Sequence, residues 1–436
     1  MASGQKPPNG RGPQGPSPII PGRPGRPSFS LDALRELVER QFSEETANRA
    51  DILLELDSEP KRRALIAEIA DYVLAVEAIT LSPADRRYII QEAYRNLFTF
   101  GPLEPLLQDE RVTEIVVDGP RQVRARWGLG KLQPVEIAFQ DTYHLEGVLQ
   151  RALSTVGAAL RPDSPFLEVG VELLERATRI SVATPPISTQ YMLEIRLHPR
   201  QGLTLEALIE RSALSERVVE LLRAILSGGH GLLIVGEAGT GKTTLAAALS
   251  HALPADAPTL AVQRAAEMAL PAHVQPRLPA PPTPQAPAQP FGDVLSAALA
   301  EAPNWLLVDE IRGDDEASAL WDALTRDAPP RYVWTFRGTP QAERLRSALS
   351  MAIRRAAPDA PQATLHRALA ERLPFVVTLR REGEGARVDS IAEWELREDG
   401  DALALRPLVS TQGAGWALTG ASPQHDLPLP ASWWRD

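Results

Sequence analysis

The chain has 436 residues, more than one compact core usually holds, so we expect at least two folded domains with extensions. Its 46 lysines and arginines against 56 aspartates and glutamates give a net charge of −10, which disfavours a general nucleic-acid-binding protein. The sequence contains no cysteine, which excludes disulfides, thiolate zinc sites and cysteine nucleophiles within it.

The N-terminal third begins with a segment of unusual composition. Residues 1–30 contain eight prolines, six glycines and four basic residues, and this composition predicts a disordered tail. Residues 31–98 then show helical spacing, with Leu31, Leu34 and Val38 on one face. Ser82–Asp85 is typical of a helix start, because serine caps a free amide and proline fits the first turn. We therefore predict a helical N-terminal segment over residues 31–98.

The remaining sequence predicts two further domains. Residues 99–200 contain short alternating runs around one helical stretch, which predicts a small α+β domain. From Leu203 onward strand and helix patterns alternate, which is typical of a parallel sheet, and we predict an α/β domain over residues 201–436. Residues 271–290 contain eight prolines, and we expect an extended surface loop there.

One motif in the α/β domain predicts a phosphate-binding loop. The apolar run Leu232–Val235 is followed by GEAGTGKT and then by a helical pattern, which places a G-x-x-x-x-G-K-[ST] motif between a strand and a helix. Glycines allow the backbone amides to turn inward, and the helix N-terminus adds partial positive charge. Lys242 then reaches the β- and γ-phosphates, and the Thr243 hydroxyl joins the Mg²⁺ shell. The candidate ATP-binding residues are Gly236, Glu237, Ala238, Gly239, Thr240, Gly241, Lys242, Thr243 and Thr244.

A second apolar strand ends in two carboxylates. Trp305–Val308 leads directly into Asp309 and Glu310. Beside a phosphate-binding loop, we expect Asp309 to hold Mg²⁺ through water and Glu310 to orient or deprotonate the attacking water. The alternative is a strand end that carries two solvated acids and no function.

Several segments resemble one protein family. The chain has GPLEPLL at Gly101–Leu107, VTEIVVDG at Val112–Gly119, AAE at Ala265–Glu267 and DSIAE at Asp389–Glu393. Together with the two motifs above, these segments resemble the type II/IV secretion-system ATPases, and within them the CpaF-like motors of Tad pili. The resemblance runs from about residue 98 to about residue 420.

The resemblance implies a RecA-like P-loop ATPase domain preceded by the α+β domain, with ATP between the two. It also implies a homo-hexamer or a mixed ring with a paralogue, docked at the cytoplasmic face of an inner-membrane platform. By this resemblance Arg179 and Arg196 approach the phosphates, whereas by residue type alone each is an ordinary strand arginine. We expect a cytoplasmic protein, since the apolar runs are all shorter than the roughly 20 residues of a membrane span.

The sequence departs from the family where catalysis is concerned. Gln263–Arg264 replaces an acidic pair, so a carboxylate near the nucleotide is lost and a positive charge is gained. Residues 292–303 lack four arginines of a basic run, and Phe336 stands at a histidine position. Asp309 stands where glycine is common, and Arg312 or Arg337 is a candidate replacement for a missing positive charge.

Two functions therefore remain open from the sequence. The first is an ATP-hydrolysing motor for a Tad-like pilus or a type II/IV secretion system. The second is a nucleotide-binding, hydrolysis-impaired partner of such a motor. A DNA-handling ATPase is disfavoured by the net charge of −10.

Overall fold

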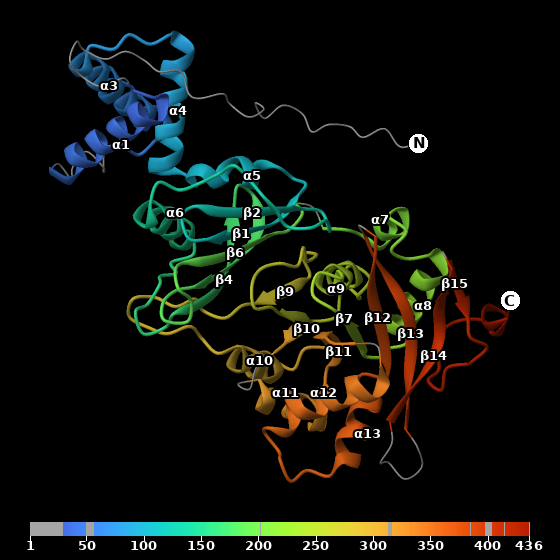
Figure 1. The fold of residues 1–436 in the computed structure, drawn as a ribbon. Helices are drawn as coiled ribbons and strands as arrows, with labels where there is room; N and C mark the ends of the chain where they lie inside the picture. The colour runs from blue at the N-terminus through green and yellow to red at the C-terminus, as the bar shows by residue number, and fades with distance from the viewer. Residues whose placement is uncertain are drawn as a thin grey trace. The chain divides into compact units, whose positions relative to one another are not determined.

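The structure is a computed structural model that describes residues 29–48, 56–200, 202–312, 316–339, 341–383, 385–396, 403–413 and 415–435. The tail expected at residues 1–30 lies outside the described residues except for Phe29 and Ser30. By internal contacts the chain divides into two units, residues 1–105 with 137–151, and residues 106–136 with 152–436. Each unit is described separately below (Figure 1).

The first unit contains a cluster of three helices within residues 31–98, where the sequence predicts a helical segment. Helices α1 (Leu31–Asn48), α3 (Glu59–Glu77) and α4 (Pro83–Phe98) bury Leu34 and Ile66 among other apolar residues. The Ser82 hydroxyl accepts a hydrogen bond from the Asp85 amide at 3.1 Å, which confirms the predicted helix start. The turn η1 (Gly101–Leu103) follows, then α5 (Glu104–Gln108), which begins in this unit, and α6 (Thr142–Ser154), most of which belongs to it.

The second unit begins with a six-stranded antiparallel sheet in the order β3-β2-β1-β6-β5-β4. The strands are β1 (Val112–Asp118), β2 (Gln122–Trp127), β3 (Gln133–Pro134), β4 (Phe166–Leu173), β5 (Arg176–Ala183) and β6 (Met192–Leu197). In β6 buried positions alternate with more exposed ones, because successive side chains of a strand point to opposite faces. In β5 the three consecutive residues Thr178, Arg179 and Ile180 are all buried. The register of the β5–β6 pair sets Arg179 directly opposite Arg196.

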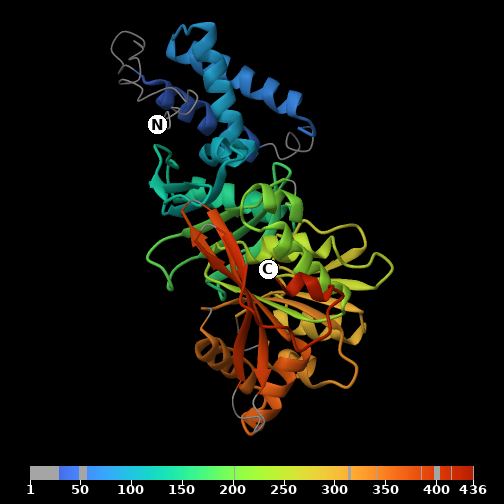
Figure 2. The ribbon, with the colours of Figure 1, turned by 90° about the vertical axis from the view of Figure 1, so that its right-hand side faces the viewer.

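A nine-stranded sheet forms the centre of the second unit, in the order β15-β14-β13-β12-β7-β11-β10-β8-β9. Its parallel part contains β7 (Leu232–Gly236), β8 (Thr259–Val262), β9 (Val274–Arg277), β10 (Trp305–Ile311), β11 (Arg331–Arg337) and β12 (Phe375–Glu382). The antiparallel strands β13 (Gly385–Leu396), β14 (Leu403–Gln412) and β15 (Gly415–Leu418) extend it, at the red end of the ribbon in Figure 2.

Helices cover both faces of this sheet. One face packs against α7 (Leu205–Glu210), α8 (Glu216–Ser227) and α9 (Lys242–Ser250). The other packs against α10 (Phe291–Ala300), α11 (Ala317–Thr325), α12 (Ala342–Arg354) and α13 (Gln362–Arg372). Strand β7 serves both cores, with Ile234 in the first and Val235 in the second. A strand buried on both faces has a continuous apolar sequence, as Leu232–Val235 does. The parallel strands with helices on both faces confirm the α/β fold class.

The proline-rich segment corrects one expectation. Residues 274–277 are not loop but form β9, the edge strand of the sheet, which pairs with β8 alone. An edge strand tolerates Pro276 because one side of the strand needs no ladder hydrogen bond. The following residues fold back on themselves, with the Gln289 amide bonded to the Ala280 carbonyl at 3.0 Å.

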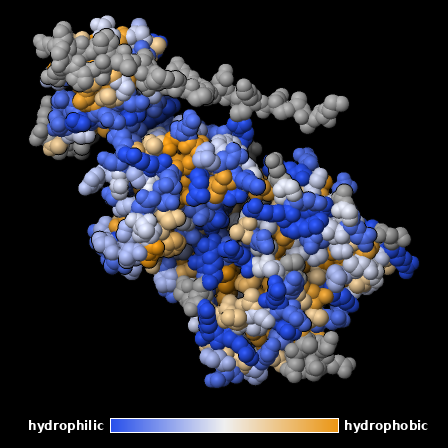
Figure 3. Space-filling model, viewed as in Figure 1, coloured by the Kyte–Doolittle hydropathy of each residue, from blue (hydrophilic) through white to orange (hydrophobic). Residues whose placement is uncertain are grey.

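A short turn, η2 (Ala431–Trp434), closes the described chain. None of the described helices is long and apolar enough to cross a membrane. On the face shown in Figure 3, hydrophilic residues cover much of the second unit and apolar residues lie between them in smaller groups. The large apolar side chains are mostly in the two cores instead, where Trp305, Trp334 and Phe375 are fully buried.

A buried carboxylate predicts how stability depends on pH. Glu393 of β13 is fully buried and pairs with Arg406 at 2.8 Å and with the His425 ring at 2.7 Å. Burial opposes its ionisation, but these partners and two backbone amides hold the pKa of Glu393 at about 2, against 4.5 in the unfolded chain. The ionised form is therefore favoured by folding above pH 4.5, and this stabilisation is lost as the pH falls toward 2.

We expect Glu393→Gln to unfold with a shallower dependence on pH between about 5 and 2 than the unsubstituted protein. Denaturant melts at a series of pH values measure this dependence. Equal slopes for the two proteins would contradict the ionised buried state of Glu393.

Candidate functional site

The G-x-x-x-x-G-K-[ST] segment forms a loop between β7 and α9. Gly236 ends β7, and α9 begins at Lys242 with Gly241 as its N-cap. Gly239 and Gly241 have φ of +74° and +84°, values that favour glycine. A side chain at Gly236 would lie 2.4 Å from the Thr240 hydroxyl. Each of the three glycines is therefore required by the loop's own geometry.

Lys242 lies against this loop rather than in solvent. Its side chain is buried, and Nζ donates a hydrogen bond to the Glu237 carbonyl at 2.9 Å. Burial lowers the pKa of Lys242, and the carboxylates of Glu310 and Asp309 oppose this shift. A desolvated cation that donates to a neutral carbonyl gains strongly from an anion placed beside it.

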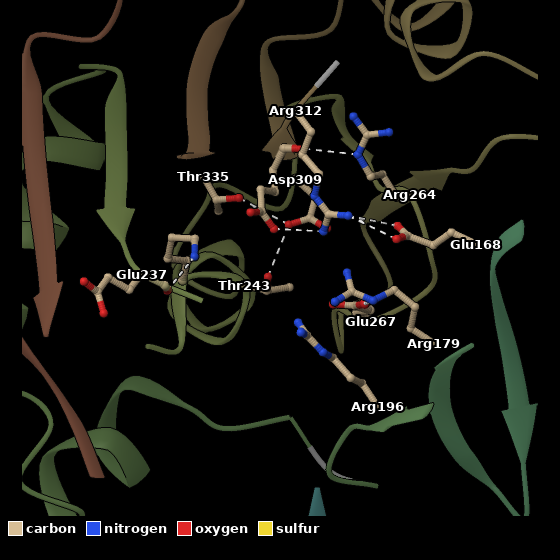
Figure 4. Close-up of polar contacts among 12 residues, drawn as sticks. Glu168, Arg179, Arg196, Glu237, Thr243, Arg264, Glu267, Asp309, Arg312 and Thr335 are labelled. Atoms are coloured by element: carbon tan, nitrogen blue, oxygen red, sulfur yellow. Dashed lines mark hydrogen bonds and ion pairs between the residues drawn. The ribbon is translucent and has the colours of Figure 1, made fainter. Parts of the chain in front are cut away.

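The acidic strand end meets the loop directly. Asp309 of β10 is 1% exposed, and its Oδ1 accepts hydrogen bonds from the hydroxyls of Thr243 and Thr335, each at 3.2 Å (Figure 4). Burial raises the pKa of Asp309, and the charges of Glu267 and Glu310 add to this effect. A carboxylate beside a hydroxyl is a donor set that suits Mg²⁺. The contact brings the two predicted metal ligands together.

Glu310 follows Asp309 in β10 and, unlike Asp309, lines the cavity beside the loop. Its Oε2 pairs with Arg312 Nη2 at 2.9 Å, and Arg312 Nη1 also reaches Glu168 of β4 at 3.1 Å. Burial alone would raise the pKa of Glu310, but Arg312 and Lys242 outweigh it and lower the pKa. Glu310 is therefore ionised at neutral pH, as a proton acceptor must be.

The two predicted arginines face the loop from the antiparallel sheet. Arg179 is buried, and its Nε lies 3.0 Å from Oε1 of Glu267. Arg196 pairs with Glu194 on its own strand at 2.5 Å. Glu267 is itself ionised, because His198, Arg179 and Arg196 lower its pKa against the effect of burial. Both arginines are held by carboxylates that an incoming polyphosphate would have to displace.

A cavity of about 830 Å³ connects these groups. Residues Ala238–Thr244, Arg179, Arg196 and Glu310 line it, so most of the predicted site residues share one space. Gly236, Glu237 and Asp309 do not line it: Asp309 lies behind Thr243, and Lys242 covers the Glu237 carbonyl.

Comparison with known proteins decides the family. The family described as "Type II/IV secretion system protein" matches residues 99–326, more than half of the chain. The chain belongs to the type II/IV secretion system ATPase family. This assignment covers the antiparallel sheet, the loop and the acidic strand of the site.

Individual relatives of this chain are distant in sequence. A Mycobacterium tuberculosis protein named "Putative conjugal transfer protein" is 29% identical over 229 residues, which are 50% of this chain and 64% of that protein. The match thus spans less than two thirds of that relative. The Brucella suis VirB11 ATPase of a type IV secretion system, solved with sulphate, is 20% identical with a TM-score of 0.34, covering 69% of this chain and 97% of that one. The pilus retraction motor PilT with ADP is 15% identical with a TM-score of 0.45, covering 66% and 80%.

The structure places the residues at which the sequence is expected to depart from the family's pattern. Arg264, expected as an added charge near the nucleotide, is not a cavity-lining residue and pairs with Glu316 instead. Arg312 is already bound to Glu310 and Glu168, whereas Arg337 lines the cavity at the end of β11. Phe336, at the histidine position, is buried in the core beside it.

Sequence reasoning missed three polar residues of the site. Thr335 bonds Asp309, Glu168 pairs with Arg312, and Arg381 of β12 donates to the Ala238 carbonyl at 3.3 Å. Arg381 also lies over Gly239, where a side chain would come within 2.6 Å of Nη2. Of the three, Thr335 could have been predicted from the sequence, because it is a polar residue between the apolar residues Trp334 and Phe336 near a strand end. The other two come close to the site through pairing between distant segments.

The Arg179–Glu267 pair predicts a large effect on stability. Glu267→Ala leaves the Arg179 guanidinium buried without its carboxylate. We expect the free energy of unfolding to fall by about 3–5 kcal/mol, the usual cost of breaking a buried ion pair. Denaturant melts measure it.

The matched control is Glu206→Ala, which breaks the exposed pair with Arg223 and is expected to cost under about 1 kcal/mol. A loss for Glu267→Ala no larger than that of this control would contradict the prediction.

Proposed function

We propose that this chain binds Mg·ATP at the loop Gly236–Thr243 and hydrolyses it to power a Tad-like pilus or a type II/IV secretion machine. The observation that carries the proposal is the 3.2 Å contact between the Thr243 hydroxyl and Asp309. It joins a phosphate-binding loop to a buried carboxylate at the end of a neighbouring parallel strand. This pairing of groups is what a Mg²⁺-dependent nucleotide hydrolase requires.

Each group has a defined part in this reaction. The amides of the loop and of the α9 N-terminus bind phosphate oxygens, and Lys242 exchanges the Glu237 carbonyl for the β- and γ-phosphates. Thr243 and Asp309 hold Mg²⁺, which when bound neutralises developing charge on the phosphates. Glu310 accepts the proton of the attacking water. Arg179 and Arg196 approach the phosphates from the antiparallel sheet after release by Glu267 and Glu194.

A second function is supported by a specific contact. Glu310 is paired with Arg312, which in turn is paired with Glu168, so the proposed base is engaged in this arrangement. Such a chain binds nucleotide and turns it over weakly or not at all, as a structural or regulatory partner of an active motor. In this second function Arg312 stays on Glu310 when nucleotide binds, whereas in the motor the carboxylate is available to the attacking water.

Membership of the family supports a proposal for the larger assembly in which the chain works. We propose a cytoplasmic ring, a homo-hexamer or a ring mixed with a paralogue, docked at the inner face of the membrane on a platform protein. In this scheme residues 31–98 form a helical segment, 99–200 the small domain that closes over ATP, and 201–436 the RecA-like ATPase domain. The net charge of −10 disfavours nucleic acid as the moved substrate.

Multiple-turnover phosphate release and equilibrium ATP binding, measured on the same preparation with Mg²⁺, test the proposal. A motor binds ATP and releases many equivalents of phosphate per chain. Binding without turnover supports the partner function and overturns the motor. The absence of binding overturns both.

A further inference from the structure

Arg264 has a partner that the family pattern does not suggest. It follows β8, at a position where the family has an acidic residue, and its guanidinium pairs with Glu316 just before α11. Glu316 is completely buried, and the Arg264 guanidinium lies 4.3 Å above the centre of the Phe291 ring. A buried carboxylate requires such a partner, because an unpaired one would be strongly destabilising.

This ion pair also holds the strand that carries Glu310. Arg264 Nε donates to the Glu310 carbonyl at 3.2 Å, and Glu316 Oε2 accepts from the Arg312 amide at 2.9 Å. The backbone from residue 310 to residue 312 is therefore bound at both ends by one Arg–Glu pair. Figure 4 shows Arg264 reaching this segment from the side opposite the phosphate-binding loop.

The held segment determines where two charged side chains lie. The pairing of β10 with β11 shifts register between Val308 and Ile311, and within this irregular stretch Asp309 and Ile311 are buried. Glu310 and Arg312 line the cavity. A shift of the 310–312 backbone would move the carboxylate of Glu310 relative to the attacking water. Misplacement of about 1 Å can cost about 10²-fold in rate.

We propose that Arg264 and Glu316 together act as a positioning unit for Glu310 in ATP hydrolysis. The proposal rests on the proposed function, because it assigns the unit to that same reaction. Neither residue touches the cavity, so the unit acts on kcat and leaves the affinity for Mg·ATP nearly unchanged.

The test compares four variants of the Arg264–Glu316 pair and one control variant, all in the full chain, with the unsubstituted protein. Arg264→Gln and Glu316→Gln each remove one charge with little change of shape, and the double variant removes both. Arg264→Lys keeps the charge but lacks the fork that contacts Glu316 and the Glu310 carbonyl at once. Arg277→Gln is the matched control, because it breaks an Arg–Glu pair with Glu301 that lies outside the cavity.

Three readouts are taken: kcat, the dissociation constant of Mg·ATP, and hydrogen exchange of the Arg312 amide without nucleotide. We expect each Gln variant to lose about 10²-fold in kcat with the dissociation constant within threefold of the original. The double variant is expected to lose no more than the worse single variant, Arg264→Lys to recover part of the loss, and Arg277→Gln to match the original. Arg312 exchanges faster in the Gln variants while the amides of β7 do not.

Unchanged kcat and unchanged Arg312 exchange would overturn the positioning unit. Equal acceleration of exchange in β7 and at Arg312 would also overturn it, because the pair would then support the fold in general. If the unsubstituted protein has no turnover, the proposal of ATP hydrolysis is overturned. The role of the Arg264–Glu316 pair in that reaction is then overturned as well. Exchange at Arg312 then still reports separately whether the pair holds the 310–312 segment.

Discussion

Replacing Glu310 by glutamine is expected to reduce phosphate release by about 10²–10⁴-fold, the usual contribution of a positioned general base. The substitution keeps the shape of the side chain and removes its ability to accept a proton. The affinity for Mg·ATP is expected to stay within a few-fold, because Lys242, Thr243 and Asp309 remain in place. Steady-state phosphate release and equilibrium nucleotide binding measure the two effects separately.

The control for this variant is Glu301→Gln, an exposed glutamate that pairs with Arg277 outside the cavity. It is expected to leave both readouts unchanged. A Glu310→Gln protein that hydrolyses ATP at the original rate would assign proton transfer to another group. It would also make the ion pair with Arg312 the main role of Glu310.

Replacing Lys242 by alanine is expected to weaken Mg·ATP binding by about 10²-fold or more. The reason is the loss of two charge-assisted hydrogen bonds to the β- and γ-phosphates, each worth about 1.5 kcal/mol or more. The free protein is expected to unfold at nearly the same denaturant concentration, because Lys242 is desolvated in it and donates to a neutral group, the Glu237 carbonyl. Calorimetric titration with Mg·ATP measures the loss.

Lys61→Ala is the matched control, since Lys61 is exposed and pairs with the exposed Asp57, four positions before it. Its variant is expected to bind Mg·ATP as the unsubstituted protein does. If Lys242→Ala changes the affinity by less than threefold, the phosphates do not lie against this loop.

Local signals in the sequence predict the parts of this fold that depend on near neighbours. The run Leu232–Val235 is buried on both faces, as its continuous apolar sequence predicts. In the loop after it, Gly239 and Gly241 are favoured by their positive φ angles. The strand Trp305–Val308 and the cap at Ser82 are similarly local. These elements were predicted because propensity, pattern and turn chemistry agree in each of them.

Pairing between distant segments was not predictable in the same way. Arg381 reaches Ala238 across 143 positions, and Glu168 reaches Arg312 across 144. Nothing within a few residues of either side chain marks such a contact. The prediction of a loop in the proline-rich segment was wrong for a different reason. Pro276 excludes a central strand but is compatible with an edge strand. The sequence predicts that Arg264 adds a charge to the nucleotide site. Its actual partner, the buried Glu316, lies 52 positions away by their residue numbers, so nothing near Arg264 in the sequence indicates the pair.

Calorimetric titration of the unsubstituted protein with ATP, with and without Mg²⁺, tests the central claim most directly. The contact between Thr243 and Asp309 predicts saturable binding of one ATP per chain that weakens markedly when Mg²⁺ is removed. Asp309→Asn is expected to abolish the difference between the two conditions. Binding that is absent, or that is equally tight with and without Mg²⁺, would contradict a Mg·ATP site at this loop.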